Sequence, residues 1–237
     1  MRNTDNKIAI MQPYFFPYPW YFKLIDTVDI FVFLDDVNYI KRGYINRNKL
    51  RNRRHTIDIR IPLSKSSQNK RINNIKINDY TQFKAGLLKT YQMCYSRSNY
   101  FMNANELLDN TLCSFTGVTV SDFNIHSTKK IMSYLGIATN TLRSSALSNS
   151  KLVRGEDRLF DICKQIGAFN YYNLPGGREL YSFDRFAENN ISLNFLEESD
   201  IQYTQFAPSN FISNLSILDF LAFGNNSLSP QKFARNK

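Results

Sequence analysis

The stretch KIAIMQPYFFPYPWYFKLIDTVDIFVFLDD, residues 7–36, decides the fold class. Residues 7–12 are mostly apolar and predict a short buried strand, and the prolines that follow exclude a regular helix or a central strand. We expect a helix from about residue 20, then a second strand over 29–35. That strand is almost continuously apolar, which is typical of a strand covered on both faces. Strand, loop, helix and strand in this order predict a βαβ unit with parallel strands.

The rest of the chain continues to alternate between helical and strand patterns. A strand is predicted over 55–63, with 72–77 as its hairpin partner, and further strands over 139–145, 168–173 and 191–198. Helices are predicted over 81–95, 104–116, 121–135, 157–167 and 213–223. This order predicts an α/β fold: a mostly parallel, Rossmann-like sheet with flanking helices and a small insertion of hairpin and helices. We expect one domain over residues 1–237 with a polar, frayed tail at 225–237.

Composition narrows the function classes. The 237 residues carry a formal net charge of +10, which favours anionic ligands, although solubility alone is an alternative reason for it. No apolar run approaches the ~18 residues of a membrane span, so we expect a cytoplasmic protein without membrane insertion. Cys94, Cys113 and Cys163 lack metal spacing and are expected to be reduced core thiols. His55 and His126 have no partners at metal or triad spacing, so no metal site is predicted.

The proline-rich loop after the first strand is a candidate binding loop, because ligands of α/β proteins bind at the carboxyl ends of parallel strands. Gln12 offers an amide, and Tyr14, Tyr18 and Tyr21 offer hydroxyl groups. The alternative is that the loop is an aromatic corner of the core, and we expect that for its phenylalanines.

Asp35 and Asp36 end the second strand. Adjacent residues of a regular strand point to opposite faces, so we expect one carboxylate to face a site and the other to cap the following turn. The site-facing carboxylate would act as a general base, hold a metal through water, or bind a sugar hydroxyl or an amine. The alternative is a plain turn-forming pair.

A basic run follows, with seven Lys or Arg residues and no acid between Asp36 and Asp58. Arg42 and Arg47, with Asn46 between them in sequence, are suited to hold a diphosphate through bidentate contacts. Two alternatives stay open for this run: a nucleic-acid site that uses nearby tyrosines for stacking, and a solvated loop. Three further arginines, Arg51, Arg53 and Arg54, are expected to be surface charge.

A second candidate anion site follows the strand over 139–145. Ser144 and Ser145 end that strand, and Lys151 and Arg158 flank the start of the next helix. A helix N-terminus beside hydroxyl groups and cations attracts anions, although ordinary turn chemistry would leave the same pattern.

Several of these motifs together resemble the WbqC-like family of bacterial proteins. The matching stretches are QPYFFPY (12–18), DD (35–36), IKRGYINRN (40–48), RSS (143–145), RLFDICKQIGA (158–168), LPGG (174–177) and NLSILDFL (214–221). The resemblance implies a role in O-antigen or other surface-polysaccharide biosynthesis, and attachment of small acyl or aminoacyl groups, such as glycyl, to sugar amines. One departure is Trp20, where relatives carry a glycine that permits close backbone approach.

Three hypotheses follow. The first, which we favour, is an enzyme that forms an amide on the amine of a nucleotide-linked amino sugar. Arg42 and Arg47 would hold the diphosphate, Asp35 or Asp36 would take a proton from the sugar ammonium, and Gln12, Tyr14 and Asn46 would orient the sugar. The donor is open: an aminoacyl-tRNA, an acyl thioester or an adenylate made from ATP. The second hypothesis is an ATP-dependent nucleotidyl-transfer or ligase enzyme, because the first strand–helix–strand unit weakly resembles such proteins. The third is a non-catalytic protein that binds nucleotide sugars or RNA.

Overall fold

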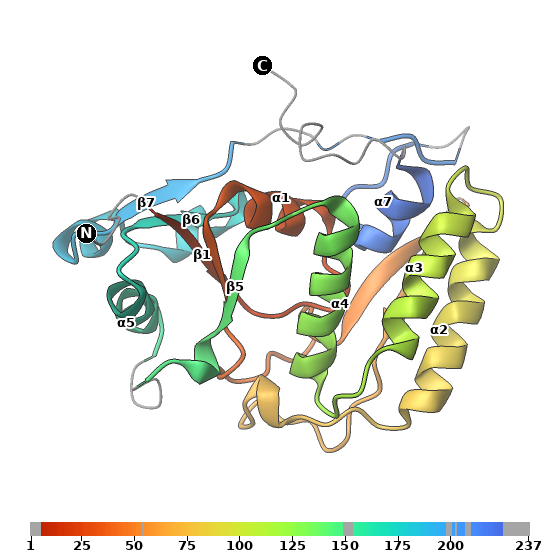
Figure 1. The fold of residues 1–237 in the computed structure, drawn as a ribbon, viewed down its shortest axis with the longest axis horizontal. Coiled ribbons are helices and arrows are strands. Elements are labelled where there is room, and N and C mark those ends of the chain that lie inside the picture. Colours follow the sequence, from red (N-terminus) through yellow and green to blue (C-terminus); the bar gives the residue numbers. More distant parts are fainter. Residues whose placement is uncertain are drawn as a thin grey trace. The chain divides into compact units, whose positions relative to one another are not determined.

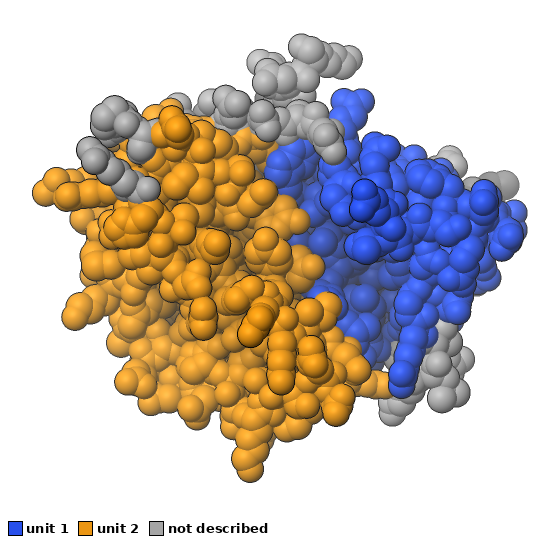
Figure 2. All heavy atoms as spheres, turned by 180° about the vertical axis from the view of Figure 1, so that it is seen from behind, with its two compact units in different colours: residues 1–12, 20–37, 138–200 blue, residues 13–19, 38–137, 201–237 orange. Residues whose placement is uncertain are grey.

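The computed structural model describes residues 6–53, 55–148, 154–197, 201, 203–206 and 210–224. The contacts within it divide the chain into two compact units (Figure 2). Unit 1 consists of residues 1–12, 20–37 and 138–200, and unit 2 consists of residues 13–19, 38–137 and 201–237. The single-domain prediction concerns how the two units behave together, and it stays a prediction.

Unit 1 contains a five-stranded sheet whose strands all run parallel (Figure 1). Its strands are β1 (Lys7–Met11), β2 (Ile30–Phe33), β5 (Asn140–Arg143), β6 (Asn170–Asn173) and β7 (Ser192–Phe195). They lie in the order β5-β2-β1-β6-β7, with β1 and β2 as the predicted βαβ pair. The structure confirms the α/β fold and its parallel sheet.

Helices cover both faces of this sheet, which explains why β1 and β2 are almost entirely apolar. The helices of unit 1 are α1 (Pro19–Thr27), α5 (Glu156–Ile166) and α6 (Phe183–Glu188), with 3₁₀ turns η2 (Ser144–Ala146) and η3 (Pro175–Leu180). Ile10 and Val32 belong to a core shared with Phe160 of α5. On the other face, Phe31 lies 5.3 Å from Tyr21 of α1 between ring centroids.

Unit 2 combines a hairpin with helices that pack side by side (Figure 1). Its elements are β3 (Arg47–Asn52), β4 (His55–Arg60), η1 (Ile72–Asn74), α2 (Tyr80–Tyr95), α3 (Phe101–Cys113), α4 (Val120–Leu135) and α7 (Ile217–Phe223). Helix α4 begins with a capping box between Thr119 and Asp122 and ends at Gly136, whose φ of 72° is unstrained only for glycine. The predicted helices over 81–95, 104–116 and 121–135 are confirmed within a few residues at each end.

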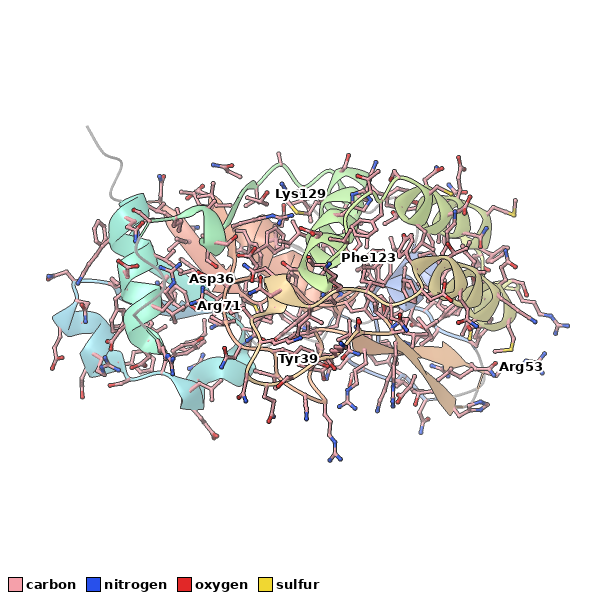
Figure 3. The ribbon with its side chains drawn as sticks, turned by 90° about the horizontal axis from the view of Figure 1, so that it is seen from below. Asp36, Tyr39, Arg53, Arg71, Phe123 and Lys129 are labelled. Atoms are coloured by element: carbon pink, nitrogen blue, oxygen red, sulfur yellow. The ribbon has the colours of Figure 1, made fainter. Side chains whose placement is uncertain are left out.

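The phenylalanines of the loop 13–19 lie in the core of unit 2, as predicted. Phe15 and Phe16 are buried, and the ring of Phe123 on α4, labelled in Figure 3, lies 6.1 and 5.8 Å from theirs. The side-chain amide of Asn48 donates hydrogen bonds to the backbone carbonyls of both phenylalanines, at 3.1 and 2.8 Å. This buried asparagine therefore helps to satisfy a loop whose prolines and strained turn (φ of Phe16 is 41°) leave carbonyls without a regular partner.

Two predictions about the basic run are wrong. The partner of β4 is β3, not residues 72–77, which begin as the turn η1. Arg51 is fully buried rather than surface charge, whereas Arg53 is exposed at the tip of the hairpin (Figure 3); Arg54 lies outside the described residues. β3 was missed because its alternation, with Asn48 and Leu50 facing inward, is hidden in the sequence by the density of charge. Helix α6 was not predicted at all.

Candidate functional site

Asp35 and Asp36 lie in one hydrogen-bonded cluster in unit 1. Strand β2 ends at Phe33, so the alternation that was expected to separate the two carboxylates does not extend to them. The Ser144 hydroxyl lies 3.2 Å from Oδ1 of Asp35 and 2.5 Å from Oδ1 of Asp36. Ser145 donates to Asp35 from its backbone N–H at 3.0 Å and from its hydroxyl at 2.8 Å. The structure therefore brings together four predicted site residues.

Arg158 joins the same cluster from α5. Its Nη2 lies 3.2 Å from Oδ2 of Asp36 and 3.1 Å from the Ser144 carbonyl oxygen, and its Nη1 lies 2.8 Å from Oδ2 of Asp161. Its Nε has no hydrogen-bond partner among the described residues. The guanidinium is thus engaged by two carboxylates, and the cluster, with three carboxylates and one guanidinium, does not form the anion site that was predicted here.

The two carboxylates differ in access. Both oxygens of each carboxylate accept hydrogen bonds, and the residues differ only in exposure, 0% for Asp35 and 8% for Asp36. Both are held by the cluster, and Asp36 keeps slightly more exposed surface than Asp35. Of the two predicted proton acceptors, Asp36 is the better placed.

Gln12 and Tyr21 are brought together in unit 1 by the turn from β1 into α1. The Tyr21 hydroxyl donates to the backbone carbonyl of Gln12 at 2.9 Å, and the ring is fully buried against Phe31. Tyr21 therefore has no exposed surface, while the side chain of Gln12 is half-buried. Lys151 lies outside the described residues.

Unit 2 contains an open pocket of about 470 Å³ on its basic hairpin, a size within the range of small-molecule sites. Its lining combines four charged side chains with polar groups and one short segment: Arg42, Arg47, Lys49, Asp58, Asn48, Thr56 and residues 212–215. Unit 2 also holds 20 of the 30 Lys and Arg residues of the chain but only 6 of its 20 Asp and Glu residues. The pocket therefore lies in a strongly positive unit.

The hairpin register places one pair of like charges and one pair of opposite charges directly across from each other. Arg47 on β3 pairs with Arg60 on β4, and Lys49 pairs with Asp58. Directly opposed side chains have Cβ atoms only ~4.5–5.5 Å apart, so two facing arginines repel and destabilise a bare hairpin. A pair of this kind is stabilised when an anion lies between or beside the two guanidinium groups.

The turn before β3 fixes two of the predicted residues. Arg42 adopts a left-handed conformation with φ of 64°, and the Arg47 guanidinium donates a hydrogen bond to its carbonyl. Asn46 accepts from the Tyr39 hydroxyl at 2.7 Å and donates to the Ile61 carbonyl at 3.2 Å. Asn46 thus anchors the turn that presents Arg42 and Arg47, and both arginines line the pocket as predicted.

Three tyrosines gather beside this pocket. The ring of Tyr44, which lines the pocket and is 44% exposed, lies 5.6 Å from that of Tyr14 and 5.9 Å from that of Tyr18. Burial, with smaller contributions from the other two phenols, raises the pKa of Tyr18, so its hydroxyl stays neutral. The rigid loop 13–19 therefore holds Tyr44 as an aromatic surface on the pocket wall.

The opposite wall of the pocket, residues 212–215, depends on polar contacts with β3. The backbone N–H of Ser216 donates to the Lys49 carbonyl at 3.0 Å. Buried Arg51 donates to the Gln205 side chain and to the backbone carbonyls of Phe206 and Asn210, at 3.3 and 3.2 Å for the carbonyls. Gln205 in turn accepts from the backbone N–H of Ile212 at 2.9 Å. Burial of Arg51 is explained by these acceptors from a distant part of the chain.

Asp219 on α7 completes this buried network. Its carboxylate accepts hydrogen bonds from the hydroxyls of Tyr95 and Tyr203, both at 2.6 Å, and from Gln205 at 3.0 Å. Burial raises the pKa of Asp219 above its ordinary value, although these hydrogen bonds oppose the rise. The network ties α2, α7 and the segment before residue 212 into one framework behind the pocket wall.

Sequence reasoning missed several pocket residues. Lys49 stands out in the sequence only as one member of the basic run, and Thr56 and Asp58 lie within a predicted strand with no role assigned to them. Their signal was the period-2 alternation of residues 47–60, which places Lys49, Thr56 and Asp58 on one face with Arg47. Residues 213–215 were expected to begin the last helix, which instead starts at Ile217, and their place in the pocket lining depends on a contact distant in sequence. Among the described residues, no group of three or more His, Cys, Asp and Glu side chains is arranged to hold a metal ion.

Comparison with known proteins identifies the family. The model of the WbqC-like protein family matches residues 12–229, which include the turn of Arg42 and Arg47, the carboxylates and the pocket wall. The chain belongs to the WbqC-like protein family. Uncharacterized protein Rv1507c of Mycobacterium tuberculosis (strain ATCC 25618 / H37Rv) is 28% identical over 220 residues, covering 91% of this chain and 92% of the relative. No solved structure matches this WbqC-like chain, and no described helix is long and apolar enough to cross a membrane.

Proposed function

We propose that this WbqC-like chain is a transferase that forms an amide on the amine of a nucleotide-linked amino sugar, in the building of surface polysaccharides. The observation that carries the proposal is the pocket of unit 2, where Arg42, Arg47 and Lys49 line one cavity of about 470 Å³. Two arginines can hold the diphosphate through paired N–H groups, while the lysine acts as a point charge. Binding would also relieve the repulsion between Arg47 and Arg60.

The reaction requires a nucleophilic nitrogen and a proton acceptor. The sugar nitrogen attacks the carbonyl carbon of the donor, a C–N bond forms, and the bond from that carbon to the leaving oxygen or sulfur breaks with its electron pair. An ammonium nitrogen loses two protons on the way to an amide, and we assign one to an aspartate and the other to the leaving group. Asp36 is our candidate for that aspartate, since it is slightly more exposed than Asp35, the other predicted acceptor.

The donor is one of three chemical classes, an aminoacyl ester of tRNA, an acyl thioester or an acyl adenylate made from ATP. The positive charge of unit 2 suits the first of these, because RNA binding depends on phosphate neutralisation by Lys and Arg. ATP consumption would distinguish the third.

The test is turnover of a nucleoside diphosphate amino sugar with each donor class, read by mass spectrometry as the acylated sugar nucleotide. Product with one donor class and no product from the N-acetylated sugar would support the proposal. Binding without product from any donor would instead favour a non-catalytic nucleotide-sugar protein. Release of pyrophosphate without an acylated sugar would favour a nucleotidyl-transfer enzyme. Failure of the purified chain to bind any sugar nucleotide would refute the proposal.

A further inference from the structure

A carboxylate lies among the cations of the unit 2 pocket. Asp58 on β4 lines the cavity with Arg42, Arg47 and Lys49, and it stands directly opposite Lys49 in the hairpin register. A pocket that only had to hold a diphosphate would be weakened by a negative charge in its wall. The position of Asp58 therefore calls for a positively charged group in the ligand.

The carboxylate of Asp58 is available to a ligand. Its Oδ2 accepts a hydrogen bond from Nη2 of Arg60 at 2.8 Å, but the two side chains are 45% and 61% exposed. An exposed ion pair of this kind contributes little to stability, so a ligand cation can share the carboxylate or replace Arg60 at little cost. Oδ1 of Asp58 accepts no hydrogen bond from the residues that the structure describes.

The charge state of Asp58 suits a cation anchor. The hydrogen bond from Arg60, together with the positive charges of Arg60, Lys49 and Arg47, lowers the pKa of Asp58 below its ordinary value. The side chain is thus ionised throughout the neutral range and is a poor proton acceptor. Recognition of a cation and removal of its proton would then fall to different residues.

We propose that Asp58 selects, among nucleotide-diphosphate ligands, those that carry a protonated amine. This inference rests on the proposed function, because it takes the diphosphate to be held by Arg42 and Arg47. Asp58 would receive the ammonium of the sugar while the adjacent cations receive the phosphates. The pocket would thereby discriminate the free amino sugar from its acylated product, which has lost the positive charge and would be released.

A purely structural role for Asp58 predicts something different. If Asp58 served only to pair Arg60 and support the hairpin, its loss would weaken every ligand in the same direction, since all of them use the same cations. If Asp58 binds the protonated amine, its loss changes the affinities of the ligands in opposite directions. The amine-bearing ligand loses an attraction, and the bare diphosphate loses a repulsion.

The experiment is calorimetric titration of the wild type and Asp58→Asn with UDP, UDP-glucosamine and UDP-N-acetylglucosamine. We expect the wild type to prefer the free amine over the acetylated sugar by about 10-fold, the ratio that corresponds to one modest charge-assisted contact. In Asp58→Asn the preference should fall to within about twofold, while affinity for UDP stays the same or rises. Glu106→Gln is the matched control: it removes one exposed negative charge from unit 2 outside the pocket lining, and it should preserve the preference.

Each outcome has a distinct meaning. Equal weakening of all three ligands in Asp58→Asn, or an unchanged preference, would overturn the role of Asp58 while leaving the diphosphate site in place. A wild type that binds UDP but does not prefer the amine would overturn it as well. A wild type that binds none of the three would overturn the proposed function, and the inference with it.

Discussion

The carboxylate of Asp36 and the guanidinium of Arg158 form an ion pair that is almost completely removed from water. Oδ2 and Nη2 are 3.2 Å apart, and the two side chains are only 4% and 3% exposed. The hydroxyl and carbonyl of Ser144 complete the coordination. Removal of one member leaves the other as a buried charge with fewer partners. Substitution of either residue therefore tests how much the cluster contributes to the stability of unit 1.

Arg158→Met should lower the free energy of unfolding by about 3–5 kcal/mol, because Asp36 then stays buried without its cation. Urea denaturation followed by circular dichroism measures the change. The control is Arg185→Met, which also breaks ion pairs to carboxylates on α5, but whose side chain is 45% exposed; it should cost no more than about 1 kcal/mol. Similar losses of unfolding free energy in both variants would show that burial does not make the Asp36–Arg158 ion pair more important for stability than an exposed one.

Asp36→Asn should lower turnover strongly while affinity for the bare nucleotide diphosphate stays nearly intact. An amide keeps the shape of the carboxylate but cannot accept the proton of the sugar ammonium, and the bare nucleotide has no amine. Steady-state kinetics and titration of the same preparation separate the two effects. Asp35→Asn should chiefly affect stability, by about 1–3 kcal/mol, because both oxygens of Asp35 accept hydrogen bonds from Ser145. Full activity of Asp36→Asn would exclude Asp36 as the base.

Arg47→Ala should weaken binding of a sugar nucleotide by roughly 10- to 150-fold, the equivalent of one charge-assisted hydrogen bond of ~1.5–3 kcal/mol. We expect Arg42→Ala to behave alike. The melting temperature of the ligand-free Arg47 variant should fall by no more than a few degrees, because the substitution also removes the repulsion from Arg60. Arg97→Ala, which removes an exposed arginine of unit 2 outside the pocket lining, is the control. Unchanged affinity in both pocket variants would place the phosphate site elsewhere.

The buried carboxylate of Asp219 should leave a signature in the pH dependence of stability. Its pKa is raised in the folded protein, mainly by burial, so the folded state holds this proton at pH values where the unfolded state has lost it. The free energy of unfolding of the wild type, relative to Asp219→Asn, should therefore rise as the pH falls from 7 toward about 4. Urea titrations of both proteins at several pH values measure this difference. A difference that falls over the same range would contradict the raised pKa.

The βαβ unit and most helices could be predicted because their signals are local. Residues 8–11 and 30–34 are apolar without interruption, and Gly136 and Gly167 end helices with φ values of 72° and 74°. The hairpin partner could not be found in the same way, because β3 has a charged residue at every second position and only Leu50 as an apolar member. The period-2 pattern there is a pattern of charge rather than of hydrophobicity.

The site was predictable in part for a similar reason. Arg42 and Arg47 were found because a dense basic run stands out in a sequence, and Asp35 and Asp36 because they follow an obvious strand. The burial of Arg51 was not predictable, since its acceptors lie on residues 205–210. The position of Asp58 in the pocket was not predictable either. In the sequence it is one polar residue on an alternating strand, and its neighbours across the hairpin are not known.

The contact between Arg51 and Gln205 joins residues 154 positions apart in the chain. During synthesis, the hairpin leaves the ribosome long before the segment that forms the other wall of the pocket, and domains fold as the chain emerges. Until residues 201–216 arrive, the nascent chain holds a bare cationic hairpin and a guanidinium group that still lacks the acceptors it has in the folded protein. The pocket is therefore among the last features of unit 2 to form, and a ribosome-bound chain halted before residue 201 should not retain a sugar nucleotide.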